Sequence, residues 1–130
     1  MRRATIVTRW IVRLTGIVQI LLGVLFWTGH ARTLIPVHML VGSIVVLGLW
    51  VLTGLTARAR RGAGLTGLAI VLGLALPIVG VVQARVLPGA MHWVIQVVHL
   101  LLGLGVLRLA EVLAEPVVAR GRGATLADAA

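Results

Sequence analysis

Long apolar runs, separated by short segments that carry arginine, dominate the chain. Four runs reach the roughly 20 residues that a helix needs to cross the hydrocarbon of a membrane. They cover about residues 10–28, 35–56, 65–84 and 91–113. Each is continuously apolar rather than alternating, and each is far too long for a strand of a membrane barrel. The pattern predicts an all-α integral membrane four-helix bundle, with residues 1–130 forming a single membrane domain.

Composition points the same way. Of the 130 residues, 60% are hydrophobic, and the mean hydropathy is +1.12. A soluble domain of this length could not bury so much apolar surface. Cysteine is absent, which excludes disulfides, iron–sulfur clusters and thiolate metal sites.

The net charge of +9 comes from arginines that are unevenly distributed. Only Arg32 and Arg85 lie at the end of the runs that we take as the outer side. This bias predicts a prokaryotic cytoplasmic membrane protein with both termini inside. Because the arginines flank apolar runs, we assign them to anionic lipid headgroups and expect no nucleic-acid partner. The other arginines are Arg2, Arg3, Arg9, Arg13, Arg58, Arg60, Arg61, Arg108, Arg120 and Arg122.

The two ends of the chain carry weaker signals. The first run starts like a secretory signal, but it is long and lacks a small-x-small cleavage site after Trp27, so we expect a mature helix. After the fourth run, a short amphipathic continuation is expected to stop near Pro116. There Arg108 can pair with Glu111 and Glu115 on its own helix. Residues 121–130 are rich in Gly and Ala and are predicted to be disordered.

The two halves of the chain resemble each other. Segment 37–42 reads Val-His-Met-Leu-Val-Gly, and segment 98–103 reads Val-His-Leu-Leu-Leu-Gly, 61 positions later. The spacing of Gly16 and Gly23 recurs in Gly73 and Gly80, 57 positions later. We therefore predict two repeated helix pairs in parallel orientation, related by an axis along the membrane normal. The shared composition of apolar helices is the alternative explanation.

Two histidines stand at equivalent places in this repeat. A histidine in hydrocarbon is costly and normally has a partner. His38 on the second helix and His99 on the fourth could bind opposite faces of one haem iron as axial ligands. Gly42 and Gly103 lie one turn away on the same faces, which leaves room for a porphyrin edge. The sequence predicts a haem b site with one haem, or alternatively two.

The depths of the two histidines leave a second pairing open. His38 lies about three residues inside its run and His99 about eight inside, a difference of about 8 Å along a helix. His92 is therefore the alternative partner of His38. Interhelical hydrogen bonds from Gln19 or Gln96 would also explain His99.

Four groups at the outer edge complete the candidate site. Arg32 and Arg85 could pair with haem propionates or anchor the chain to lipid. His30 and His92 are either interfacial side chains, partners of a propionate, or ligands of a second haem.

Several of these motifs resemble the haem A synthase family over about residues 10–110. They are Gln19-x3-Gly23, Pro36-Val37-His38 with Gly42, and Val98-His99 with Gly103. That family consists of two four-helix bundles, and in each one a histidine on the second helix and one on the fourth can ligate haem. The resemblance implies that this chain corresponds to one such half, standing alone or as a homodimer.

The chain also departs from that family. The catalytic half of the family has a Glu three residues before the histidine, where this chain has Ile35 and Gln96, and often an Arg just after it, where this chain has Met39 and Leu100. The paired loop cysteines of the family are missing too. The resemblance therefore implies haem binding and argues against haem hydroxylation.

These observations favour a b-type cytochrome with bis-histidine ligation. Its expected role is electron transfer or haem holding, with a quinone or a membrane redox protein as partner. The alternatives are a haem-modifying enzyme, a non-haem accessory subunit of a membrane complex, and an exporter of haem or metal.

Overall fold

Four long helices form the fold, as the apolar runs predict. The computed structural model describes residues 1–57 and 63–127. The helices are α1 (Arg2–Trp27), α2 (Ile35–Ala57), α3 (Ala63–Val82) and α4 (His92–Ala127). Short 3-10 turns at Arg32–Leu34, Gln83–Arg85 and Gly89–Met91 belong to the two connections α1–α2 and α3–α4. All four helices are long and apolar enough to cross a membrane, which confirms the all-α class within the described residues.

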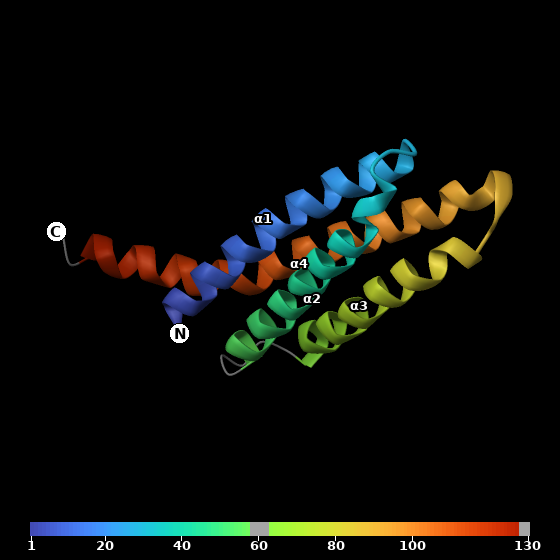
Figure 1. The fold of residues 1–130 in the computed structure, drawn as a ribbon. Coiled ribbons are helices and arrows are strands. Elements are labelled where there is room, and N and C mark those ends of the chain that lie inside the picture. The colour runs from blue at the N-terminus through green and yellow to red at the C-terminus, as the bar shows by residue number, and fades with distance from the viewer. Residues whose placement is uncertain (58–62, 128–130) are drawn as a thin grey trace.

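The helices pack with α2 and α4 at the centre. These two contact each other and run in the same direction, while α1 and α3 each pack against both of them (Figure 1). The connections 28–34 and 83–91 lie at one end of the bundle, which we call the loop end (Figure 1). This arrangement places two helix pairs side by side, each of them antiparallel within the pair.

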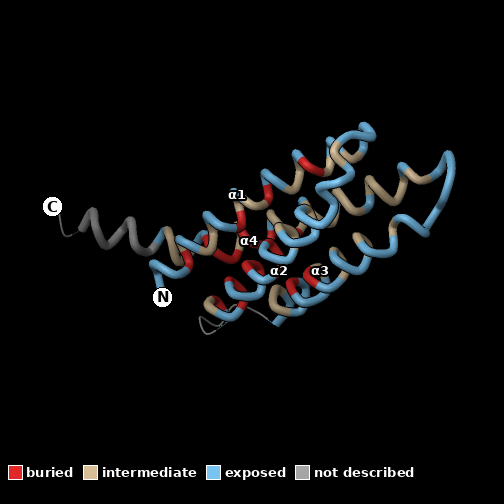
Figure 2. Tube along the Cα trace, in the orientation of Figure 1, coloured by how far each residue is buried: buried red, intermediate tan, exposed pale blue. Residues whose placement is uncertain are grey.

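Tight packing is concentrated at the opposite end, which we call the core end (Figure 2). On α2 no residue before Val45 is buried, and on α4 no described residue before Val106 is buried. On α3 burial ends at Gly73. The fully buried residues of α2, α3 and α4 therefore lie at the core end, and these helices are more exposed towards the loop end. The buried core cluster comprises Val12, Val45, Leu49, Leu52, Ala69, Val106, Leu109, Ala110, Leu113 and Ala114.

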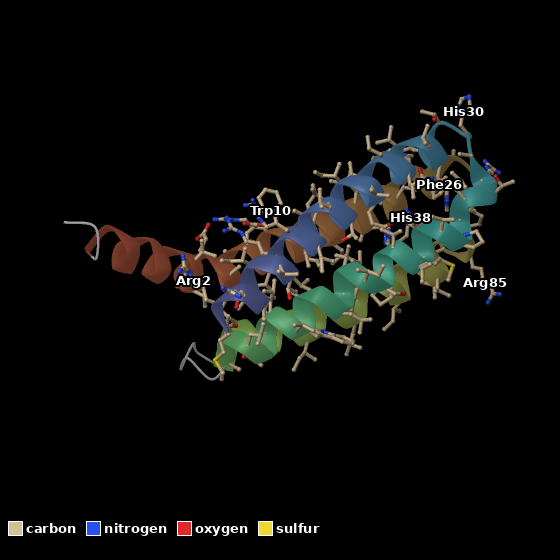
Figure 3. The ribbon with its side chains drawn as sticks, turned by 60° about the vertical axis from the view of Figure 1, so that its left-hand side comes forward. Arg2, Trp10, Phe26, His30, His38 and Arg85 are labelled. Atoms are coloured by element: carbon tan, nitrogen blue, oxygen red, sulfur yellow. The ribbon has the colours of Figure 1, made fainter. Side chains whose placement is uncertain are left out.

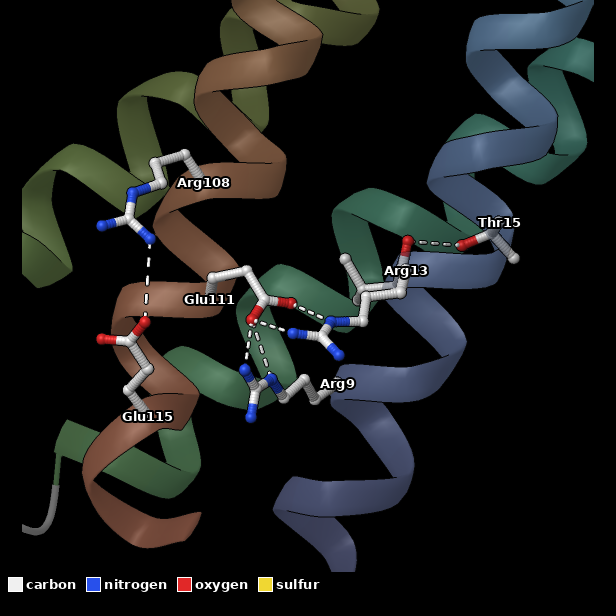
Figure 4. A network of polar contacts seen from close by, with 7 residues as sticks. Arg9, Arg13, Thr15, Arg108, Glu111 and Glu115 are labelled. Carbon is white, nitrogen blue, oxygen red and sulfur yellow. Dashed lines mark hydrogen bonds and ion pairs between the residues drawn. The ribbon is translucent and has the colours of Figure 1, made fainter. Parts of the chain in front are cut away.

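A charged cluster joins α1 to α4 at the core end (Figure 4). Glu111 accepts two hydrogen bonds from Arg13, one from Nε at 2.6 Å and one from Nη2 at 2.8 Å. Arg9 Nε donates to the second carboxylate oxygen at 2.8 Å, and Arg9 Nη2 lies 2.6 Å from that oxygen. Charge-assisted, bidentate contacts of this kind are among the strongest side-chain interactions in proteins.

The sequence suggested different partners for these groups. Arg108 was expected to pair with both acidic residues of its own helix, yet it contacts only Glu115, at 3.7 Å. Glu111 faces α1 instead, because helix packing brings it next to two arginines about a hundred positions away in sequence. Spacing along one helix cannot reveal such an interhelical partner.

The end of α4 also differs from the expectation. The helix does not stop near Pro116 but continues to Ala127, and Figure 1 shows it changing direction in its final part. A proline inside a helix removes one amide donor and clashes with the preceding turn. Such a residue bends a long helix rather than ending it when the turns on both sides remain hydrogen-bonded. Residues 121–127 were predicted to be disordered but belong to α4, whereas residues 128–130 lie outside the described residues.

The charged cluster yields a prediction on stability. Replacing Glu111 with Gln should lower the free energy of unfolding by about 1–3 kcal/mol, because two partly buried guanidinium groups lose their counter-charge. Replacing Glu115 with Gln on the same helix should change it by less than about 0.5 kcal/mol, since that pair is long and exposed. Denaturant unfolding in detergent micelles measures both. Equal effects of the two substitutions would contradict the assignment.

Candidate functional site

The structure brings His38 and His99 together towards the loop end of the bundle. Their ring centroids are 6.3 Å apart, and the ring planes meet at 48°. His38 lies one turn into α2, and His99 lies two turns into α4. The difference in depth is absorbed because α4 begins further out at the loop end than α2 does (Figure 1). His99, rather than His92, is therefore the ring that faces His38.

Each of these rings packs against the helix that precedes its own. Phe26 of α1 meets His38 edge to face, with ring centroids 5.3 Å apart and an interplanar angle of 69° (Figure 3). Gly80 of α3 lies beneath His99, where a Cβ atom would fall 3.0 Å from Cε1 of the ring. The ring of Phe26 thus positions the imidazole of His38, and the backbone of Gly80, which carries no side chain, positions the imidazole of His99.

Polar atoms without partners gather at this place. Nδ1 of His38 and Nδ1 of His99 are buried and make no hydrogen bond, and the same holds for Oε1 of Gln19. In the part of the chain that the structure describes, no other buried side-chain nitrogen or oxygen lacks a partner. Each such atom costs about 1–3 kcal/mol. Unpaired polar atoms that concentrate in one place mark a site built for something other than stability.

The two glycines of the repeated motif have different neighbours. A Cβ atom at Gly42 would lie 2.6 Å from Nε2 of Gln19, so α1 fills the space beside this glycine. Beside Gly103 the nearest atom is Cδ1 of Leu76, at 3.9 Å. At Gly42, the side chain of Gln19 therefore occupies the space that we expected for a porphyrin edge. The space beside Gly103 is more open.

The remaining candidates lie on the rim at the loop end. Arg32 and Arg85 are exposed and belong to the 3-10 turns. His30 is exposed and its Nδ1 lies 3.1 Å from the hydroxyl of Thr28. Figure 3 shows His30 and Arg85 pointing away from His38. The structure thus places these groups, with His92 at the start of α4, around the His38–His99 pair but not in contact with it.

Two imidazoles alone restrict the kind of metal that this site could hold. Within residues 1–57 and 63–127 no group of three or more His, Cys, Asp or Glu side chains comes together. A bare zinc ion normally needs about three or four protein ligands. A haem iron already has the four nitrogens of its macrocycle and needs only two axial ligands.

The separation of the rings agrees with that kind of ligation. A metal–imidazole bond is about 2.0 Å, so two rings bound to opposite sides of one metal have centroids about 6 Å apart. The observed separation is 6.3 Å. No described residue of α2 or α4 near the rings is fully buried, so the pair lies at the more exposed end of these helices. The two nitrogen donors and their separation fit a haem.

The sequence alone did not assign two residues, Phe26 and Gly80, to this site. Phe26 lies three residues beyond the Gly23 of the repeat, and Gly80 is the repeat counterpart of Gly23. The repeat could have predicted these neighbours, because a contact in one half of the chain has a counterpart in the other half. Gln19 lies beside Gly42, and Leu76, 57 positions later, lies beside Gly103.

Gly80 offers a test of this geometry. Changing Gly80 to Val should push a side chain into the His99 ring and lower the free energy of unfolding by about 1–3 kcal/mol through overpacking. Gly67→Val on the same helix is the matched control, since a Cβ atom there meets nothing within 4 Å. Denaturant unfolding and the NMR signals of the His99 ring measure the effect. Identical behaviour of the two variants would show that Gly80 does not support His99.

Comparison with known proteins adds no relative. No protein-family model, curated protein or solved structure matches this chain. The function must therefore be inferred from the geometry of the histidine pair and its surroundings.

Proposed function

We propose that this chain is a haem-binding integral membrane protein, a b-type cytochrome in which His38 and His99 are the axial ligands. Its role is electron transfer or haem holding. The observation that carries the proposal is the facing pair of imidazole rings, whose centroids lie 6.3 Å apart. Among the ring contacts of the described residues, this is the pair that joins two histidines.

The protein's own residues have separable tasks in this proposal. His38 and His99 each contribute one ring nitrogen, and together they fill both axial positions. A haem held in this way supplies a six-coordinate, one-electron centre with no open position for a substrate. Phe26 covers one ligand and the apolar helices keep water away, so the site suits electron transfer more than catalysis.

Charge at the loop end supports the same proposal. Arg32 and Arg85 are the cations of the two connections, and His30 and His92 lie beside them on the rim. A haem between α2 and α4 could present its propionates to these groups, which would bind them through charge-assisted hydrogen bonds. Anchoring to lipid headgroups is the other use of these arginines.

The missing acidic residue limits the chemistry. Ile35 and Gln96 occupy the positions where the haem A synthase family has a catalytic Glu. Haem hydroxylation is therefore less well supported than electron transfer or haem holding. A quinone or a membrane redox protein is the expected partner, and a second copy of the chain could complete the assembly.

The ligand assignment can be tested with absorption spectra. Protein purified from haem-sufficient cells should show the reducible spectrum of six-coordinate, low-spin haem, and a pyridine haemochrome assay should identify haem b. His38→Ala and His99→Ala should each abolish that spectrum, whereas His92→Ala should retain it. Colourless wild-type protein that does not respond to haemin would refute the proposal. Variants of His38 and His99 with unchanged spectra would favour a purely structural role for the histidines.

The orientation in the membrane is a separate prediction. Ten of the twelve arginines lie outside the two connections of the loop end, and this bias in the sequence favours a cytoplasmic location for both termini. Alkaline phosphatase fused after Leu87 should be active, because that connection would lie outside, and a fusion at Ala130 should be inactive. A green fluorescent protein fused at Ala130 should fluoresce. The opposite pattern would reverse the orientation and move the histidine pair to the cytoplasmic side.

A further inference from the structure

Oε1 of Gln19 is an acceptor that lacks a donor. In the described parts of the chain, the buried side-chain polar atoms without a partner are this oxygen and the Nδ1 atoms of His38 and His99. An amide oxygen can only accept a hydrogen bond, whereas Nδ1 of a neutral imidazole can donate one. The buried atoms that could satisfy Gln19 are therefore the two ring nitrogens.

The packing of α1 on α2 makes His38, rather than His99, the expected donor to Gln19. Gln19 lies directly against Gly42, which is one turn from His38 on the same face of α2. Two turns further along α1, Phe26 touches the His38 ring itself. Between them stands Gly23, which has no side chain to separate the amide from the imidazole. Gln19 thus lies on the face of α1 that packs against His38.

The second half of the bundle has no amide at the position that corresponds to Gln19. Leu76 takes the place of Gln19 in the repeat, 57 positions later, and its Cδ1 atom is the nearest neighbour of Gly103. An alkyl side chain cannot accept a hydrogen bond from Nδ1 of His99. The two histidines have similar places in the fold, but their neighbours differ in chemistry.

We propose that Gln19 is a positioning residue for His38, with its Oε1 accepting a hydrogen bond from Nδ1–H of the ring. This inference rests on the proposed function. The hydrogen bond holds the proton on Nδ1, so that the lone pair of Nε2 is free for a metal. His38 is then the firmly held ligand. His99 is the more easily displaced one, because the second half has Leu76 where the first half has Gln19.

Physical chemistry gives the direction of the effect. An acceptor on the far nitrogen fixes the tautomer and orientation of a ligating histidine and raises its basicity. A more basic axial ligand stabilises ferric over ferrous iron, so it lowers the reduction potential. The loss of the acceptor should raise the potential and loosen the haem.

The repeat supplies a matched pair of substitutions. Gln19→Leu makes the first half resemble the second, and Leu76→Gln makes the second resemble the first. In the haem-loaded protein, Gln19→Leu should raise the midpoint potential and weaken haem binding about tenfold. Leu76→Gln should lower the potential, and Gln19→Glu should lower it further because a carboxylate accepts more strongly. A redox titration and the ligand-field signals in electron paramagnetic resonance measure these shifts.

The haem-free protein provides an independent readout. Nitrogen NMR of labelled histidine should show His38 with its proton on Nδ1, and Gln19→Leu should remove that preference while the His99 signals stay unchanged. If Gln19 serves packing alone, its substitution should lower the unfolding midpoint but leave the potential and the tautomer as they are. That result would overturn the inference.

The possible failures are distinguishable. A wild-type protein that binds no haem refutes the proposed function and this inference together. A wild-type protein that binds haem through both histidines, with a potential insensitive to Gln19→Leu, refutes this inference alone. If Gln19→Leu does not fold, Gln19→Glu decides the question, because an unchanged potential in that variant would equally refute it.

Discussion

Polar groups inside a bundle of apolar helices must find partners within the protein or in something bound to it, because water and lipid tails cannot supply them. The core end of this chain meets that requirement. Glu111 carries its charge among apolar residues, and the guanidinium groups of Arg9 and Arg13 surround both of its carboxylate oxygens. The loop end does not meet it, since His38 and His99 come together with unpaired nitrogens. The proposed site follows from this contrast.

Packing divides the molecule in the same way. The buried residues that hold the four helices together lie at the core end, so the helices remain joined there whatever happens at the other end. Towards the loop end the side chains of α2, α3 and α4 are less buried, and the histidine pair lies there, outside the buried core cluster.

The repeat explains both the symmetry and the asymmetry of the site. Two parallel helix pairs bring equivalent histidines face to face. The neighbours that differ between the pairs then give the two histidines different surroundings. Phe26 and Gln19 belong to the first pair, whereas Gly80 and Leu76 belong to the second. Two helix pairs of similar sequence can thus bring equivalent histidines together and still give each a different set of neighbours.

The sequence alone determined the four helices and their alternating directions, because long apolar runs and short arginine-bearing segments leave few other arrangements. It also placed His38 on α2, and His92 and His99 at the start of α4 and within it. Tertiary structure decided which groups meet. His38 faces His99 rather than His92, Glu111 binds α1 rather than Arg108, and Gln19 fills the space beside Gly42. These contacts depend on the position of each helix along the bundle axis and on its tilt. Sliding one apolar helix by a single turn against its neighbour would give each side chain a different partner, although the hydropathy pattern of the sequence would stay the same.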